Sequence, residues 1–148
     1  MHLWILISLF LPALAFGQTI SADTKLLSLC EGRYLFVAHL AQMNNNEGLA
    51  KNLLLRSSRV TTAHLFLNER NGKVSGEVMN EIKTVRRAEK PALDADPERA
   101  IVLADQCDKT TPRIIAGARN MGKVWDGKKF DDWQQLIFEQ NMKSMGIR

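Results

Sequence analysis

The amino-terminal part of the chain lacks charge, because no Lys, Arg, Asp or Glu precedes Asp23. The apolar run over residues 1–15 ends in Ala13-Leu14-Ala15, which fits the small-x-small cleavage site of a secretory signal peptide. A membrane span needs about 20 apolar residues, so this run is short for a permanent anchor, which is the alternative. We therefore expect residues 1–18 to be a cleaved signal peptide and residues 19–148 to form one domain in the periplasm or outside the cell.

Cysteine is scarce, since Cys30 and Cys107 are the only two. Neither directly follows the leader, so a lipid anchor on a cleaved cysteine is not expected. Two cysteines in an exported chain most often pair, because that compartment is oxidising. We expect a disulfide between Cys30 and Cys107 that closes a long loop, with two unpaired buried thiols as the alternative.

Strong charge bias and glycosylation signals are also absent. The net charge is +4, which is only mildly basic. Domains that bind nucleic acid carry a much stronger basic bias, and an exported protein rarely meets nucleic acid. No Asn-x-Ser/Thr acceptor occurs in the sequence. We therefore expect no nucleic-acid partner and no N-linked glycan.

Sequence motifs of catalysis and cofactor binding are missing. The segment from Gly117 to Lys123 matches the first part of a phosphate-binding loop, but Val124 stands where a Ser or Thr is needed to hold magnesium. No serine lies in a G-x-S-x-G turn, and the haem-attachment motif C-x-x-C-H does not occur. Pairs of carboxylates lie where helix caps are wanted. We therefore assign no catalytic residue and no cofactor.

The histidines leave one metal-binding alternative open. His39 and Met43 lie four residues apart on one predicted helix face, and imidazole with a thioether can bind copper or haem iron. Sequence alone places no third ligand beside them, although His64 lies on the next predicted helix. A surface or hydrogen-bonded histidine is the simpler interpretation, so we assign no metal ligand.

What the sequence does contain is helical periodicity, above all from Leu26 to Met43, the longest apolar run outside the leader. Apolar residues recur there at three- and four-residue steps, as on the buried face of a helix. That face consists of Leu26, Cys30, Tyr34, Val37 and Ala41. We expect Ser21 to Asp23 to cap this helix and Asn44-Asn45-Asn46 to end it. Gly32, inside the helix, indicates the close approach of a neighbouring helix.

Two further helical patterns follow. The first, from Leu49 to Leu67, has an apolar face interrupted by Arg56, which either extends its guanidinium into solvent or meets a buried acid. The next begins at Val74 and is expected to end at Pro91. Between them, Asn71-Gly72 could be the turn of a β-hairpin, because β-branched residues flank it. We favour a helix stop at Gly72, since the helical steps continue beyond it.

The second half of the chain shows three more helix starts. Asp96-Pro97 is the clearest, as N-cap and first helical residue, and the helix it opens points Cys107 inward. A short helix should follow from Thr111-Pro112 to Gly122. The last should begin with Asp131 as its cap, in a capping box. Its inward positions are Trp133, Leu136, Ile137 and Met142. The tail over residues 143–148 should fray.

Together these patterns predict an all-α fold. We expect a compact bundle of four or five helices, whose first and fourth members are joined by the disulfide. The alternative is an α+β fold with a hairpin around Asn71-Gly72. No internal repeat, low-complexity tract or second domain is evident.

The segment from Lys109 to Lys129 is the most basic part of the chain, with Asp126 as its single acidic residue. We expect residues 123–129 to form a loop that carries Trp125. A basic loop with an aromatic anchor suits contact with an acidic protein surface, an anionic lipid or a polysaccharide. The candidate partner-binding residues are Arg119, Lys123, Trp125, Lys128 and Lys129. The alternative is a solvated loop with Trp125 packed beside the aromatic residues that follow.

These observations favour a small exported, non-catalytic protein that binds another protein. An inhibitor, an immunity factor or an accessory factor of envelope assembly would fit. The alternatives are an envelope enzyme with an active site of dispersed residues, and a metal or haem carrier.

Overall fold

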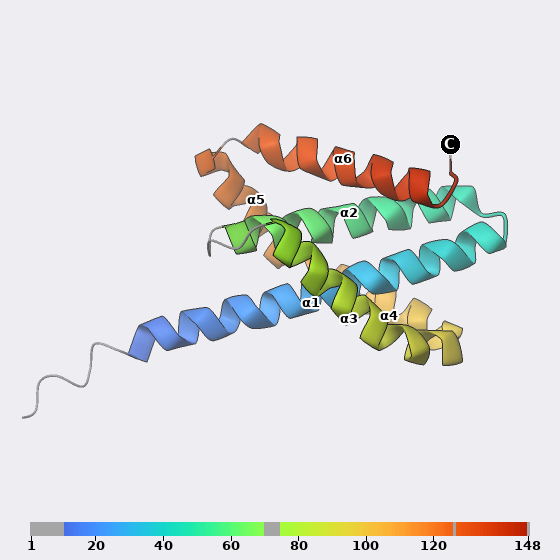
Figure 1. The fold of residues 1–148 in the computed structure, drawn as a ribbon, viewed down its shortest axis with the longest axis horizontal. Coiled ribbons are helices and arrows are strands. Elements are labelled where there is room, and N and C mark those ends of the chain that lie inside the picture. Colours follow the sequence, from blue (N-terminus) through green and yellow to red (C-terminus); the bar gives the residue numbers. More distant parts are fainter. Residues whose placement is uncertain (1–10, 70–74, 126, 148) are drawn as a thin grey trace, which may run out of the picture.

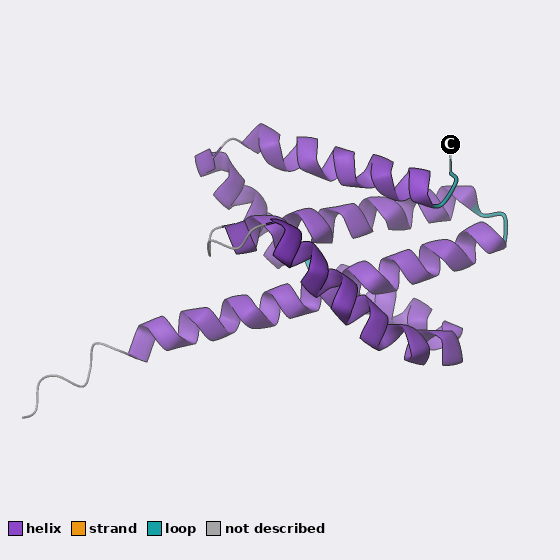
Figure 2. Ribbon diagram, in the orientation of Figure 1, coloured by secondary structure: helices purple, strands orange, loops and turns teal. Residues whose placement is uncertain are grey.

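The computed structural model describes residues 11–69, 75–125 and 127–147, and their side chains outside residues 11–21, 69 and 122–128. These residues form α1 (Leu11–Met43), α2 (Glu47–Glu69), α3 (Ser75–Ala95), α4 (Pro97–Thr110), α5 (Pro112–Trp125) and α6 (Gly127–Ser144) (Figure 1). No strand occurs in the described ranges (Figure 2). The all-α prediction is confirmed, although the bundle has six helices instead of four or five.

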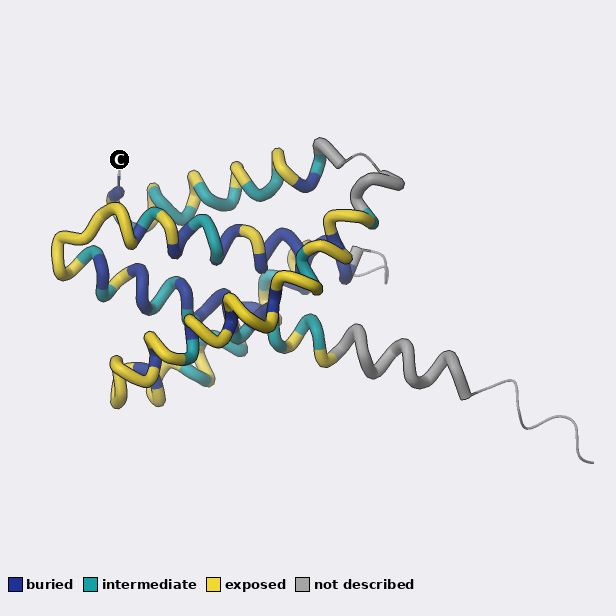
Figure 3. The backbone as a smooth tube through the Cα atoms, turned by 180° about the vertical axis from the view of Figure 1, so that it is seen from behind, coloured by how far each residue is buried: buried dark blue, intermediate teal, exposed yellow. Residues whose placement is uncertain are grey.

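Helices α1 and α2 form an antiparallel pair at the centre of the bundle (Figure 1). Helices α3 and α4 pack against α1, while α5 and α6 pack against α2. Figure 3 shows buried positions along α1 and α2, whereas most of α3 is exposed. The core therefore lies around the central pair, and α3 covers one side of it with few apolar side chains.

The face predicted for the first helix is confirmed. Its residues Cys30, Tyr34, Val37 and Ala41 are buried, and Leu26 packs against them. The close approach at Gly32 is also confirmed, because a Cβ atom added there would lie 3.3 Å from Cγ of Arg86 on α3. A larger side chain at this position would force the two helices apart.

The start of α1 differs from the prediction. The helix begins at Leu11, so the expectation that Ser21 to Asp23 cap it is wrong. No proline lies between Pro12 and Pro91. A helix that has nucleated adds residues at little cost, and nothing in this stretch removes a backbone donor.

The predicted end of α1 is confirmed in detail. The helix ends at Met43, and Asn45 adopts a φ of 56°. The Asn46 N–H donates to the Ala41 carbonyl at 2.8 Å, which makes this a Schellman cap with asparagine in the left-handed position. The Asn46 side chain then accepts from the Leu49 N–H at 3.1 Å and caps α2.

Helices lie on both sides of Asn71-Gly72, so the hairpin alternative is wrong. The predicted stop at Gly72 itself lies outside the described residues. The end predicted at Pro91 is also wrong, because α3 continues to Ala95. Pro91 has no N–H to donate to the carbonyl of Arg87, but Arg87 is an exposed residue, and the added turn buries Leu93.

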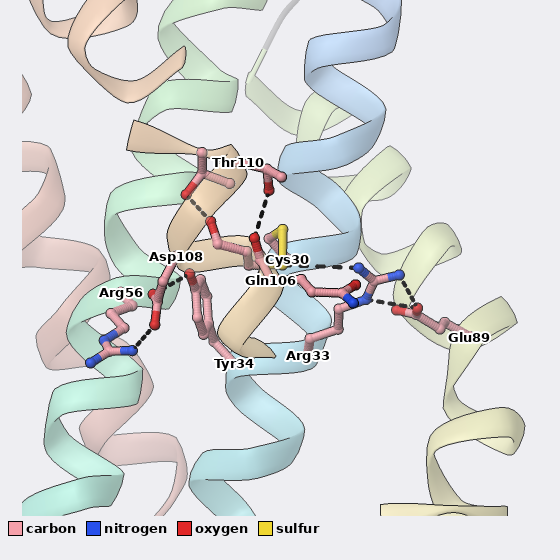
Figure 4. Close-up of a disulfide and its surroundings, with 10 residues drawn as sticks. Cys30, Arg33, Tyr34, Arg56, Glu89, Gln106, Asp108 and Thr110 are labelled. Carbon is pink, nitrogen blue, oxygen red and sulfur yellow. Dashed lines mark hydrogen bonds and ion pairs between the residues drawn. A yellow bond between two sulfur atoms is a disulfide. The ribbon is translucent and has the colours of Figure 1, made fainter. Parts of the chain in front are cut away.

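The start of α4 and the disulfide both agree with the prediction. Asp96 accepts from the Arg99 N–H at 2.9 Å, and Pro97 occupies the first turn. Cys107 is buried and bonded to Cys30, with the two Cα atoms 5.6 Å apart. The bond joins α1 to α4 inside the bundle (Figure 4).

The helix boundaries around the basic segment were predicted wrongly. Helix α5 continues through Gly122 to Trp125, and α6 begins at Gly127 instead of at Asp131. Residues 123–129 are therefore mostly the ends of two helices and not a loop. Gly122 does not end α5 and Asp131 does not begin α6, because the packing of these helices against α2 outweighs the local preferences of the two residues.

Phe130 explains why α6 begins early. Its ring is buried and packs edge-on against Phe66 of α2, with ring centroids 5.1 Å apart. Asp131, on the next position, pairs with Arg119 of α5 and does not cap the helix. Of the predicted inward positions, Trp133, Ile137 and Met142 are partly buried. Leu136 is 52% exposed, so that prediction is wrong.

The carboxyl-terminal tail packs on the bundle, so the prediction that it frays is wrong. Gly146 has a φ of +68°, and the Ile147 N–H donates to the Met142 carbonyl at 3.0 Å in a second Schellman cap. Ile147 is buried, and the Gln42 side chain of α1 donates to the Met145 carbonyl.

The disulfide should supply a large part of the stability. Its cysteines are separated by 77 positions, and closing a loop of that size lowers the entropy of the unfolded chain. The double variant Cys30→Ala/Cys107→Ala should lose about 4 kcal/mol of unfolding free energy, measured by urea denaturation. Reduction of the wild type should give the same loss. A change under about 1 kcal/mol would contradict this role.

Candidate functional site

The facing surfaces of α1 and α3, which we call the α1–α3 seam, are joined by two ion pairs. Arg86 of α3 donates to Glu31 of α1 at 2.7 Å. In the opposite sense, Arg33 of α1 donates twice to one oxygen of Glu89, at 2.9 and 2.7 Å. Gly32 lies between the two α1 residues, so the helices meet closely where the charges pair.

Glu31 is the most deeply buried charged residue of the seam. Its Oε2 atom has no hydrogen-bond partner among the described residues. Burial raises the pKa of Glu31 from 4.5 to about 7, and the charge and hydrogen bond of Arg86 oppose this shift only in part. The charge of the seam therefore changes near neutral pH.

A second polar cluster flanks the disulfide on the side of α2 (Figure 4). The Tyr34 hydroxyl donates to Asp108 Oδ1 at 2.8 Å, and Arg56 pairs with the other oxygen. Burial and this hydrogen bond raise the pKa of Tyr34 well above its ordinary value. Arg56 thus meets an acid, but a partly exposed one. The cluster ties α1, α2 and α4 together beside Cys30.

An apolar groove of about 460 Å³ opens at the end of the seam toward Met43. Its apolar lining consists of Leu35, Phe36, Leu40, Met43, Leu93 and Pro97. His39, Arg86 and Lys90 add basic groups, and Lys90 pairs with Asp94 at 2.6 Å. Met43 is 66% exposed, the largest value among the exposed large apolar residues of the described chain. We call this recess the apolar groove.

A more polar cleft of about 630 Å³ lies at the other end of the seam, where α2 also contributes. Ser28 of α1 and His64 of α2 are buried, with Oγ 3.0 Å from Nδ1. Glu81 of α3 places Oε2 3.8 Å from Nε2 of the same ring. The remaining lining residues are Thr24, Lys25, Glu77, Asn80, Thr84 and Val85. We call this recess the polar cleft.

The predicted partner-binding residues lie at the junction of α5 and α6. Arg119 pairs with Asp131 and lies over the Phe130 ring, 5.7 Å from its centroid. Lys129 is partly buried. The side chains of Lys123, Trp125 and Lys128 lie outside the described residues. Only Arg119 and Lys129 can therefore be placed, and Arg119 already has partners within the chain.

The residues considered as metal ligands separate into two places. His39 and Met43 line the apolar groove, whereas His64 lies in the polar cleft. Across the described ranges, no group of three or more His, Cys, Asp or Glu residues is arranged to hold a metal ion.

Sequence reasoning missed both recesses because each is formed by residues from three helices. Periodicity places residues on a face, but it does not say which faces meet. One signal was available: Ser28 and His64 are polar residues within apolar helix faces, and such residues are buried only with a hydrogen-bond partner.

No protein-family model, curated protein or solved structure matches this chain. Among the described helices, none combines the length and apolar character that crossing a membrane requires.

Glu31 should make the stability of the protein depend on pH. Because its pKa is higher in the folded state than in the unfolded chain, the folded state binds more protons between pH 4.5 and 7. The contribution of Glu31 to stability is therefore lost as the pH rises through this range. The unfolding free energy of Glu31→Gln minus that of wild type should therefore rise by about 3 kcal/mol from pH 4.5 to pH 8, measured by urea denaturation at each pH.

Glu98→Gln removes an exposed carboxylate from α4 and is the matched control. Its stability relative to wild type should change much less across the same pH range. If the difference in unfolding free energy between Glu31→Gln and wild type stayed constant with pH, this would contradict the raised pKa of Glu31.

Proposed function

We propose that the protein is exported, loses residues 1–18 and works in the periplasm or outside the cell. The uncharged leader with its small-x-small site supports this, and so does the disulfide, since such bonds persist in oxidising compartments. The intact mass of protein recovered from an expressing bacterium should correspond to cleavage between Ala15 and Thr19. A full-length mass would contradict export with processing.

We further propose that the protein acts by binding another protein, and that the apolar groove is the docking surface. The observation that carries this proposal is the groove itself, an exposed apolar recess rimmed by basic groups. Exposed apolar surface with a polar rim is typical of protein-binding sites. An inhibitor, an immunity factor or an accessory factor of envelope assembly would act in this way.

The occupant that fits the groove is an amphipathic helix with an acidic residue at its edge. Such helices insert apolar side chains at three- and four-residue steps, and the groove offers a largely apolar lining. Lys90 and its partner Asp94 are largely exposed, so their mutual attraction is weak and Lys90 can turn to a partner carboxylate. His39 also lines the groove, as does Arg86, which is paired with Glu31.

The groove is tested with a photo-reactive amino acid at Met43 and, as a matched control, at Val102, another exposed apolar position outside the groove lining. Cross-linking in the native envelope should capture one partner from position 43 and not from 102. With that partner purified, Met43→Glu should weaken binding at least tenfold, because burying a methionine contributes about 1.5–3 kcal/mol. Val102→Glu should bind like wild type.

The same assay separates the groove from the basic segment. The variant Lys128→Glu/Lys129→Glu should retain binding if the partner docks in the groove. Loss of binding in this variant together with full binding by Met43→Glu would move the docking surface to the α5–α6 junction and overturn the proposal.

A further inference from the structure

The polar cleft brings a hydroxyl, an imidazole and a carboxylate together from three different helices. Ser28 and His64 are separated by 36 positions in the sequence, yet their Oγ and Nδ1 atoms are 3.0 Å apart. Both residues are at most 2% exposed, and both line the wall of the cleft. Glu81 completes the row on the far side of the ring, 3.8 Å from Nε2 and partly exposed at the cleft wall.

The Ser28 hydroxyl has one proton and two acceptors within reach. It lies 3.2 Å from the Thr24 carbonyl and 3.0 Å from His64 Nδ1. When it donates to the ring, the ring proton must be on Nε2, which faces the Glu81 carboxylate. A carboxylate beside Nε2 favours that tautomer, and the lone pair of Nδ1 can then accept the proton of the hydroxyl.

We propose that Ser28, His64 and Glu81 form a hydrolytic site for short, uncharged carboxylic esters. Ser28 is the nucleophile, His64 the general base and acid, and Glu81 the group that orients the ring and stabilises its protonated form. The ring nitrogens exchange the places they have in the usual serine hydrolase, where the hydroxyl faces Nε2. The chemistry is the same, because a proton on either nitrogen leaves the lone pair of the other available.

The reaction balances without a cofactor. Ser28 Oγ forms a bond to the ester carbonyl carbon, its proton passes to His64 Nδ1, and the bond from that carbon to the alkoxy oxygen breaks as the oxygen takes this proton and leaves as an alcohol. Water then attacks the acyl-serine and gives one proton to Nδ1, which passes it to Ser28 Oγ as the carboxylic acid is released. Lys25 and Asn80 also line the cleft, and in this proposal their N–H groups stabilise the oxyanion.

The lining of the cleft sets the substrate class. Glu77 and Glu81 outnumber the single cation Lys25, so an anionic acyl group would be repelled. Val85 is the one large aliphatic side chain of the lining, which leaves little apolar surface for a long acyl chain. Short neutral esters therefore fit this cleft best. The apolar groove at the other end of the seam takes no part in this chemistry.

The test is active-site labelling of the purified protein with a fluorophosphonate, together with hydrolysis of p-nitrophenyl acetate. Mass spectrometry should find the phosphonyl adduct on Ser28. Ser28→Ala should abolish labelling, and His64→Gln should lower the rate by about 10²-fold or more, as loss of a general base does. Glu81→Gln should lower it by at least about tenfold. The matched control is Ser144→Ala, which removes an exposed hydroxyl on α6 and should label like wild type.

Folding is checked separately by circular dichroism and thermal unfolding of each variant. The labelling of the wild type does not depend on any variant folding. A folded wild type with no adduct on Ser28 would overturn the proposal, as would p-nitrophenyl acetate hydrolysis that persists unchanged in folded Ser28→Ala.

Discussion

The disulfide between Cys30 and Cys107 lies where α1 meets the rest of the bundle, and the neighbouring residues of α1 depend on it. Within one turn of Cys30, Arg33 reaches Glu89 on α3 and Tyr34 reaches Asp108 on α4. Side chains this long bind well only when their helices are already held in place, because fixing them costs conformational entropy. The covalent bond supplies that constraint, and Figure 4 shows the two polar clusters on either side of it.

Helix α3 is attached to the bundle partly through polar contacts with α1, the helix that the disulfide holds in place. The buried apolar residues of α3 are Val78, Ile82 and Leu93, so hydrophobic burial alone would hold it weakly. Two ion pairs to α1 add contacts near the middle of the helix. Buried ion pairs add little net stability, because the cost of removing the charges from water offsets their attraction. They fix the position of α3 more than they stabilise the fold.

Sequence reasoning was most accurate where local chemistry decides the structure. The apolar face of α1, the stop at Asn44-Asn45-Asn46 and the cap at Asp96 each depend on neighbours within one helical turn, which periodicity and capping rules describe. It failed where contacts distant in sequence decide. Phe130 packs against Phe66, and that contact extends α6 across a stretch that reads as a turn. The pairing of Ser28 with His64 was missed for the same reason, since the two residues are 36 positions apart in the sequence and lie on different helices.

Both recesses follow from the way α3 is attached. Along the seam, Ser28 faces the region of Glu81, Glu31 faces Arg86, and Phe36 and Leu40 face the region of Lys90 and Leu93. The helices approach closely at Gly32, where the charges pair, and a recess lies toward each end of the seam. A seam packed throughout with aliphatic side chains would close both ends and would also remove the buried carboxylate.

The polar residues of the seam therefore shape the two recesses, although they do not make the fold more stable. Ser28, Glu31 and His64 are buried in the interior of a small bundle, and each carries a desolvation cost that an apolar residue would not. A disulfide that contributes about 4 kcal/mol can offset costs of this size. The bundle thus keeps buried polar groups beside one recess and a basic rim around the other, and these are the two surfaces through which we propose that it acts.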